Sequence, residues 1–158
     1  MKSFTVSSDS LSVKDPCYEW EMNIIPRIVK GTWLVEPTYC DDKLFCRAGR
    51  GRVAEIAIYH EKYYGSLSSK SWKKEPFIVH VDSGQAGFVD YKDHDKTHEE
   101  LYDDICSQTL TSESYGVIKS GAFSSSGYGD GSYECFVKTD DEKNVVAAKI
   151  VFIDTEEE

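Results

Sequence analysis

Two separate segments of this chain hold residues that could bind a negatively charged group. The segment "CRAGRGRVAE" contains Arg47, Arg50 and Arg52, three of the chain's four arginines, together with two glycines. An arginine side chain presents a planar fork of N–H donors to a phosphate or carboxylate, and neighbouring glycines let the main chain come close. The cluster therefore predicts an anion site. The alternative interpretation is surface charge that pairs with nearby carboxylates.

The second segment, "SSSGYGDGSYEC", is rich in glycine, serine and tyrosine. Successive glycine N–H groups can point into one concavity and bind an anion, serine hydroxyls add donors, and tyrosine rings let a base stack on them. The alternative is a flexible connection in which Gly129-Asp130-Gly131 makes a turn. The spacing matches neither a Walker nor a Rossmann fingerprint. The ligand-binding residues predicted outside the arginine cluster are Tyr18, Trp20, Ser124, Ser125, Ser126, Tyr128, Gly129, Asp130 and Tyr133.

Four aspartates lie in turn-rich contexts, at positions 15, 82, 90 and 130. Converging carboxylates could ligate a metal ion or act as an acid/base pair. Aspartate is also common in turns because its side chain accepts hydrogen bonds from nearby N–H groups. No D-x-D-x-D-G calcium loop and no H-E-x-x-H motif occurs, so the structural role is favoured and neither a metal nor a cofactor is expected.

Charge and cysteine content narrow the classes of function further. The net charge of −10 argues against binding to nucleic-acid backbones, which depends on lysine and arginine, but it allows one small anion in a locally positive pocket. The five cysteines form no C-x-x-C pair, so reduced thiols are expected rather than a zinc site or a disulfide framework. No apolar run is long enough to cross a bilayer, and the N-terminus lacks a signal-peptide segment. These features predict a cytoplasmic protein that does not bind membranes.

The elements that must position these residues are mainly strands. Short apolar or alternating runs predict seven or eight strands, among them "SFTVS", "IVKGTWLVE", "RVAEIAIYH", "PFIVHVDSG" and a hairpin closed by "DDEKN". One helix is predicted within 92–109, with Thr97 and Glu100 as a capping box and with Leu101 and Ile105 on one face. A Ser/Asp loop is predicted between "SFTVS" and "KDPCYEW". His80 is expected to be half-buried in an apolar strand, and His94 is expected to precede the helix. The expected fold is mainly β, an antiparallel sandwich or partly open barrel with one packed helix. It forms a single domain over 1–154, and 155–158 is an acidic frayed tail.

Along the chain the motifs "DP", "GTW-x-V", "RVAEI", "VDSGQAGFVD" and "GYGDGSYECFVKTDDEKNVVAAKIVFI" follow one another. In this order they are similar to a bacterial and phage domain-of-unknown-function family (numbered four-two-four-one). In that family the pattern includes "VD-x-G" and a C-terminal "G-F-G-D-G-x-Y-x-V"; this chain has Tyr128 at the aromatic position and Cys135 and Val137 at aliphatic ones. More loosely, the chain resembles phage counter-defence proteins that sequester cyclic nucleotides without cleaving them, the sponges of anti-CBASS type, which would act in the host cytoplasm. The residues that match the domain-of-unknown-function family are Asp15-Pro16, Gly31-Thr32, Val53-Ala54, Val81-Asp82, Gly84, Phe88, Asp90, Gly127 to Gly131, and Tyr133; the resemblance to the sponges is carried by no single motif.

These observations lead to one main hypothesis and two alternatives. The main hypothesis is a non-catalytic protein that binds and sequesters a small phosphorylated ligand, such as a cyclic di- or oligonucleotide. A pocket closed between protomers would bury more of the ligand, so a homo-oligomer is expected. One alternative is a metal-dependent phosphodiesterase that uses the four aspartates. The other is an acidic immunity or inhibitor protein that blocks a protein partner.

Overall fold

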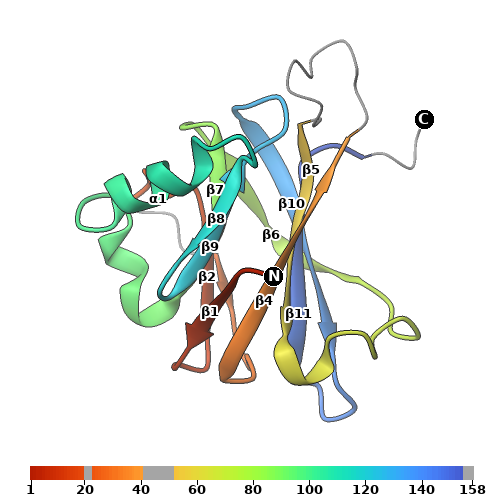
Figure 1. Ribbon diagram of the computed structural model, residues 1–158. Coiled ribbons are helices and arrows are strands. Elements are labelled where there is room, and N and C mark those ends of the chain that lie inside the picture. The colour runs from red at the N-terminus through yellow and green to blue at the C-terminus, as the bar shows by residue number, and fades with distance from the viewer. Residues whose placement is uncertain (20–22, 41–51, 155–158) are drawn as a thin grey trace.

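The structure is a computed structural model that describes residues 1–19, 23–40 and 52–154. Its larger sheet has six antiparallel strands in the order β1-β4-β5-β11-β10-β6. Figure 1 shows this twisted sheet beside a second, smaller one. The strands of the larger sheet are β1 (Ser3–Val6), β4 (Gly31–Tyr39), β5 (Val53–His60), β6 (Lys73–Val81), β10 (Gly131–Thr139) and β11 (Val145–Val151).

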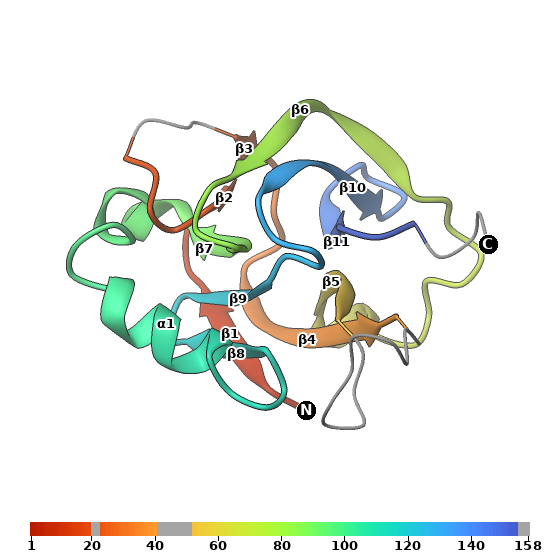
Figure 2. The ribbon, with the colours of Figure 1, turned by 90° about the horizontal axis from the view of Figure 1, so that it is seen from above.

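The smaller sheet has five antiparallel strands in the order β3-β2-β7-β9-β8. One face packs against the larger sheet and the other is covered by η2 and α1 (Figures 1 and 2). Both sheets are open, so the fold is the sandwich alternative of the predicted class. Its elements are β2 (Leu11–Lys14), β3 (Ile24–Ile25), β7 (Gln85–Asp90), β8 (Tyr115–Ile118), β9 (Gly121–Ser125), the 3₁₀ helices η1 (Glu61–Tyr63) and η2 (Tyr91–Lys96), and α1 (Tyr102–Thr109).

The alternating patterns in the sequence are confirmed where one sheet face meets the core. On β4, Trp33 and Val35 are fully buried between the sheets, and on β5 Ile56 and Ile58 are buried in the same way. Glu55 projects from the opposite face and stays partly exposed. The predicted hairpin is also confirmed, since β10 and β11 pair across the turn at 140–144.

Two local predictions were wrong. Segment 11–14 was expected to lie in a loop, but it forms β2, in which Ser12 and Lys14 are as buried as Leu11 and Val13. A strand covered on both faces loses the polar-out alternation that marks a half-buried strand, which explains the error. The capping box was also wrong, because α1 begins at Tyr102 and Thr97 instead ends η2.

The antiparallel pairing brings several strand ends to one edge of the larger sheet. The end of β11 lies beside the start of β5, since the N–H groups of Phe152 and Ile153 both donate to the carbonyl oxygen of Ala54, at 2.8 and 3.0 Å. The start of β10 lies next to that end of β11, because Glu134 pairs with Val151. The chain just before β5 and the connection before β10 therefore meet here.

Within the described ranges, no helix is long and apolar enough to span a lipid bilayer. Cys17, Cys40, Cys106 and Cys135 carry free thiols. Cys46 lies outside the described residues.

Asp90 joins the N-terminal segment to the end of β7. Its carboxylate accepts hydrogen bonds from the main-chain N–H groups of Ser7 (2.7 Å), Ser8 (3.3 Å) and Lys92 (3.2 Å), and from the Ser8 hydroxyl. Burial alone would raise the pKa of Asp90, but these hydrogen bonds outweigh it and lower the pKa below its usual 3.8. The carboxylate is thus held in its charged form by structural contacts.

We predict that Asp90→Asn lowers the free energy of unfolding at pH 7 by about 1–3 kcal/mol, because the charged acceptor of several hydrogen bonds is lost. A lowered native pKa contributes stability above the unfolded value, and this is lost as the pH falls through the native value. Urea denaturation at pH 7, 4 and 3 should therefore show the difference between wild type and variant narrowing at and below pH 4. A difference that does not change with pH would contradict this account of Asp90.

Candidate groove on the larger sheet

Arg52 and the glycine-rich segment, 75 residues apart in the sequence, are in contact. The Arg52 Nη1 donates to the carbonyl oxygen of Gly127 at 3.3 Å, and the guanidinium carbon lies 5.1 Å from the centroid of the Tyr128 ring. That ring is 61% exposed, so the pair lies at the surface. One arginine of the predicted cluster therefore meets the segment that was predicted to bind the same ligand.

The glycine-rich segment has a defined conformation maintained by its own hydrogen bonds. Gly127 and Gly129 have φ angles of +62° and +116°, which favour glycine. The carbonyl oxygen of Gly129 accepts hydrogen bonds from the Ser126 hydroxyl (2.8 Å) and the Tyr133 hydroxyl (2.6 Å). Hydrogen bonds within the segment therefore hold its conformation, whereas the alternative drawn from the sequence was a flexible connection.

The serines of this segment have internal partners. Ser124 and Ser126 are fully buried, and their hydroxyls donate to the carbonyl oxygens of Ser125 and Gly129. The N–H of Ser126 donates to the carbonyl oxygen of Gly84, and that of Ser125 to Ser114. These contacts fix the conformation of the segment around Ser126. The exposed residues of the segment are Tyr128, Asp130, Gly131, Ser132 and Glu134.

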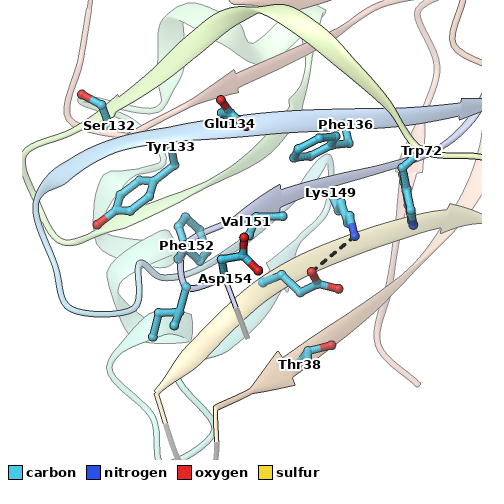
Figure 3. Close-up of a pocket in the computed structure, with 12 residues that line it drawn as sticks. Thr38, Trp72, Ser132, Tyr133, Glu134, Phe136, Lys149, Val151, Phe152 and Asp154 are labelled. Atoms are coloured by element: carbon cyan, nitrogen blue, oxygen red, sulfur yellow. Dashed lines mark ion pairs between the residues drawn. The ribbon is translucent and has the colours of Figure 1, made fainter. Parts of the chain in front are cut away.

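A groove of about 690 Å³ runs over the outer face of the larger sheet and reaches this segment (Figure 3). One end is formed by Tyr133, Phe152 and Ile153. This end lies against the glycine-rich segment, because a Cβ atom added to Gly127 would be 3.1 Å from Phe152 and 3.0 Å from Ile153. The other end is formed by Trp72 and Phe136. The remaining lining residues are Thr38, Glu55, Ser132, Glu134, Lys149, Val151 and Asp154.

Ion pairs balance much of the acidic charge in the groove. Lys149 Nζ lies 3.4 Å from Glu55 Oε2, and Lys74 Nζ lies 3.6 Å from Glu134 Oε1. Both pairs are partly exposed, so they contribute little to stability. Each lining glutamate therefore has a lysine partner, and Asp154 is the third carboxylate of the lining.

Aromatic rings supply the apolar part of the lining. Phe152 packs edge-on against Tyr133, with ring centroids 5.1 Å apart. Trp72 and Phe136 face the groove from the other end (Figure 3). The volume falls within the range of about 300–1,000 Å³ found for small-molecule sites, whereas the lining has a larger polar share than most of them.

Other predicted ligand residues lie elsewhere or outside the described part of the chain. Tyr18 follows β2 of the smaller sheet, where its N–H donates to the carbonyl oxygen of Asp15; it does not line the groove. Arg47, Arg50 and Trp20 lie outside the described residues. Sequence analysis missed Trp72, Phe136, Lys149 and the other residues of the outer sheet face. Phe136 and Lys149 do stand at outward positions of the β10–β11 hairpin, which its alternation could have shown.

Two of the four candidate aspartates, Asp15 and Asp90, have structural contacts, whereas the side chains at positions 82 and 130 are exposed. Asp15 is fully buried and accepts hydrogen bonds from the N–H groups of Cys17, Asp82 and Ser83, at 2.7–2.8 Å, and from the Ser83 hydroxyl at 2.6 Å. Asp90 has the contacts described above. Among residues 1–19, 23–40 and 52–154, no three His, Cys, Asp or Glu side chains are grouped so that they could hold a metal ion.

The histidines differ from their predicted environments in one case. His80 was expected to be half-buried in an apolar strand, but it is exposed on β6, where its Nδ1 lies 3.1 Å from the Ser132 hydroxyl. Successive side chains of β6 point to opposite faces of the sheet; Val79 and Val81 reach the core, and His80 points away from it. His94 lies in η2, before α1, as predicted.

Comparison with known proteins gave no match: no family model, no curated protein and no solved structure is similar to this chain. The two resemblances described from the sequence therefore stay predictions.

We predict that Tyr133→Phe lowers the free energy of unfolding by about 0.5–1.5 kcal/mol, because the hydroxyl that closes the glycine-rich segment on Gly129 is lost. Urea denaturation measures the change. Tyr64→Phe is the matched control, since that hydroxyl donates to Glu36 at an exposed site, and its removal should have no measurable effect. Equal losses in both variants would show that the Tyr133 hydroxyl does not stabilise the segment.

Proposed function

We propose that the protein binds and sequesters a small phosphorylated ligand with a planar ring in the groove on the larger sheet. A nucleotide fits this chemistry, and a cyclic di- or oligonucleotide is the form that the sequence resemblance suggests. The phosphate would lie at Arg52 and the ring against the aromatic residues of the groove.

The observation that carries this proposal is the contact of Arg52 with Gly127 and Tyr128. The Gly127 carbonyl and the Tyr128 ring orient the guanidinium before any ligand arrives, so less side-chain entropy is lost on binding. A guanidinium binds phosphate oxygens through parallel N–H donors, and it stays charged at any physiological pH.

The groove supplies the rest of the binding energy. Stacking of a base on an aromatic side chain is worth about 1–3 kcal/mol. Tyr133 and Phe136 belong to β10, and Trp72 immediately precedes β6. Rigid strands hold such rings more precisely than loops do. The groove is lined by a single copy of the chain, so the proposal does not require the predicted oligomer.

The state of two thiols disfavours nucleophilic catalysis by Cys17 or Cys135. Burial, and then the hydrogen bond and charge of Asp15, raise the pKa of Cys17 to about 12. Burial also raises the pKa of Cys135. A thiol attacks as its thiolate, so neither group is a nucleophile at neutral pH.

The test is calorimetric titration with a panel of nucleotides that includes adenosine monophosphate and cyclic dinucleotides, followed by mass spectrometry of the ligand recovered from the complex. Saturable binding of at least one nucleotide and recovery of the intact molecule are expected. A cleaved product would instead make the protein an enzyme. Absence of binding to every nucleotide, with a stable protein partner captured from lysate, would favour the inhibitor alternative.

We predict that Arg52→Glu weakens nucleotide binding by about a hundredfold, since it removes charge-assisted hydrogen bonds and adds repulsion. Lys30→Glu is the matched control because it makes the same charge change at an exposed residue just before β4, at the opposite end of the sheet. Circular dichroism should show both variants folded. If the two variants lose affinity equally, net charge rather than a site at Arg52 controls binding.

A further inference from the structure

The Trp72 end of the groove has a second concentration of positive charge. Two lysine ammonium groups lie over the same indole ring: Lys138 Nζ is 4.8 Å from its centroid and Lys149 Nζ is 4.6 Å from it. The ring lies in a cluster beneath the segment that follows η1, with the buried Leu67 and the half-buried Tyr59. Trp72 thus has a fixed position between the sheet and the groove.

These two lysines have one carboxylate between them within the described part of the chain. Glu55 pairs with Lys149 at 3.4 Å, whereas Lys138 donates to the uncharged carbonyl oxygen of Leu67 at 2.9 Å. The indole face attracts cations but carries no net charge. The group formed by Lys138, Lys149 and Glu55 therefore has an excess of one positive charge.

The environment of Lys138 is consistent with crowding of like charges. Burial, and then the charge of Lys149, lower the pKa of Lys138 below 10.5. An anion placed beside the two ammonium groups would remove this repulsion. Lys149 is the member that lines the groove, and Figure 3 shows its ammonium group next to Trp72 inside the groove.

We propose that the Trp72 end of the groove is a second anion subsite, in which Lys149, supported by Lys138, binds a second negatively charged group of the same ligand. The inference rests on the proposed function and specifies its ligand class as a molecule with two separated anionic groups. Lys149 and Phe152–Ile153 are three to four residues apart along the chain, or about 10–13 Å at the rise of a strand. Two anionic groups at that separation cannot belong to one phosphate, so a ligand that spans both ends carries at least two.

The subsite can be tested without the nucleotide. Inorganic pyrophosphate is titrated into the ¹⁵N-labelled protein while the indole N–H resonance of Trp72, assigned with the Trp72→Phe variant, is followed. A saturable shift is expected. Lys149→Gln should weaken pyrophosphate binding by at least about tenfold, the effect of losing one charge-assisted hydrogen bond.

Control variants separate a site from general electrostatics. Lys149→Arg keeps the charge and should retain pyrophosphate binding. Lys30→Gln removes a positive charge far from the groove and should have no effect on that binding. Lys138→Gln should weaken pyrophosphate binding by a smaller factor than Lys149→Gln does. Arg52→Gln should leave the pyrophosphate shift unchanged, because Arg52 is at the other end. An indole resonance that does not shift, or one that shifts equally in Lys149→Gln, overturns the inference.

The affinities of a short and a long nucleotide test whether one ligand occupies both ends of the groove. The linear trinucleotide pApApA should bind more tightly than adenosine monophosphate, and Lys149→Gln should abolish that advantage by weakening trinucleotide binding more than monophosphate binding. Monophosphate and trinucleotide binding with equal affinity would overturn the second subsite but not the proposed function. Failure of both nucleotides together with an intact pyrophosphate shift would overturn the proposed function alone.

Discussion

The pairing of β5 with the end of β11 brings Arg52 next to the glycine-rich segment. The carbonyl oxygen of Ala54 accepts N–H groups from both Phe152 and Ile153, and this fixes the chain just before β5 against the end of the sheet. Arg52 is two residues earlier, so its side chain reaches Gly127. In a different strand register, Arg52 would not lie next to the glycine-rich segment.

The groove follows from the same sheet. Outward-facing side chains of β5, β10 and β11 form its floor, and Trp72 bounds one end because the chain crosses the outer face of the sheet before it enters β6 (Figure 3). The charges are not spread evenly along this surface. Glutamates paired with lysines occupy the middle, and positive groups stand at Arg52 and around Trp72. An acidic protein can in this way present a surface to an anion without a basic overall charge.

The fold class could be predicted from the sequence because most strands have one buried and one exposed face. Trp33 and Val35 alternate with half-buried residues, and the turn at 140–144 marks a hairpin. β2 could not be found because both of its faces are covered, and Lys14 is buried in a way that no alternation shows. The start of α1 was misplaced because Thr97 and Glu100 have the spacing of a cap but lie before the helix.

For the site, the sequence indicated residue types but not their neighbours. The approach of Arg52 to Tyr128 depends on strand order, which no local pattern contains. Ser124 and Ser126 looked like donors for a ligand, yet their hydroxyls serve backbone carbonyls, since polar groups that become buried must find partners within the fold. Trp72 and Lys149 are distant in sequence and only tertiary structure places them together.

The most direct test of the central claim is a crystal structure of the protein grown with cyclic diadenylate. The account predicts a phosphate oxygen within hydrogen-bonding distance of the Arg52 guanidinium and a base against an aromatic ring of the groove. A nucleotide bound on the smaller sheet, or an empty groove in crystals grown at saturating nucleotide, would contradict it.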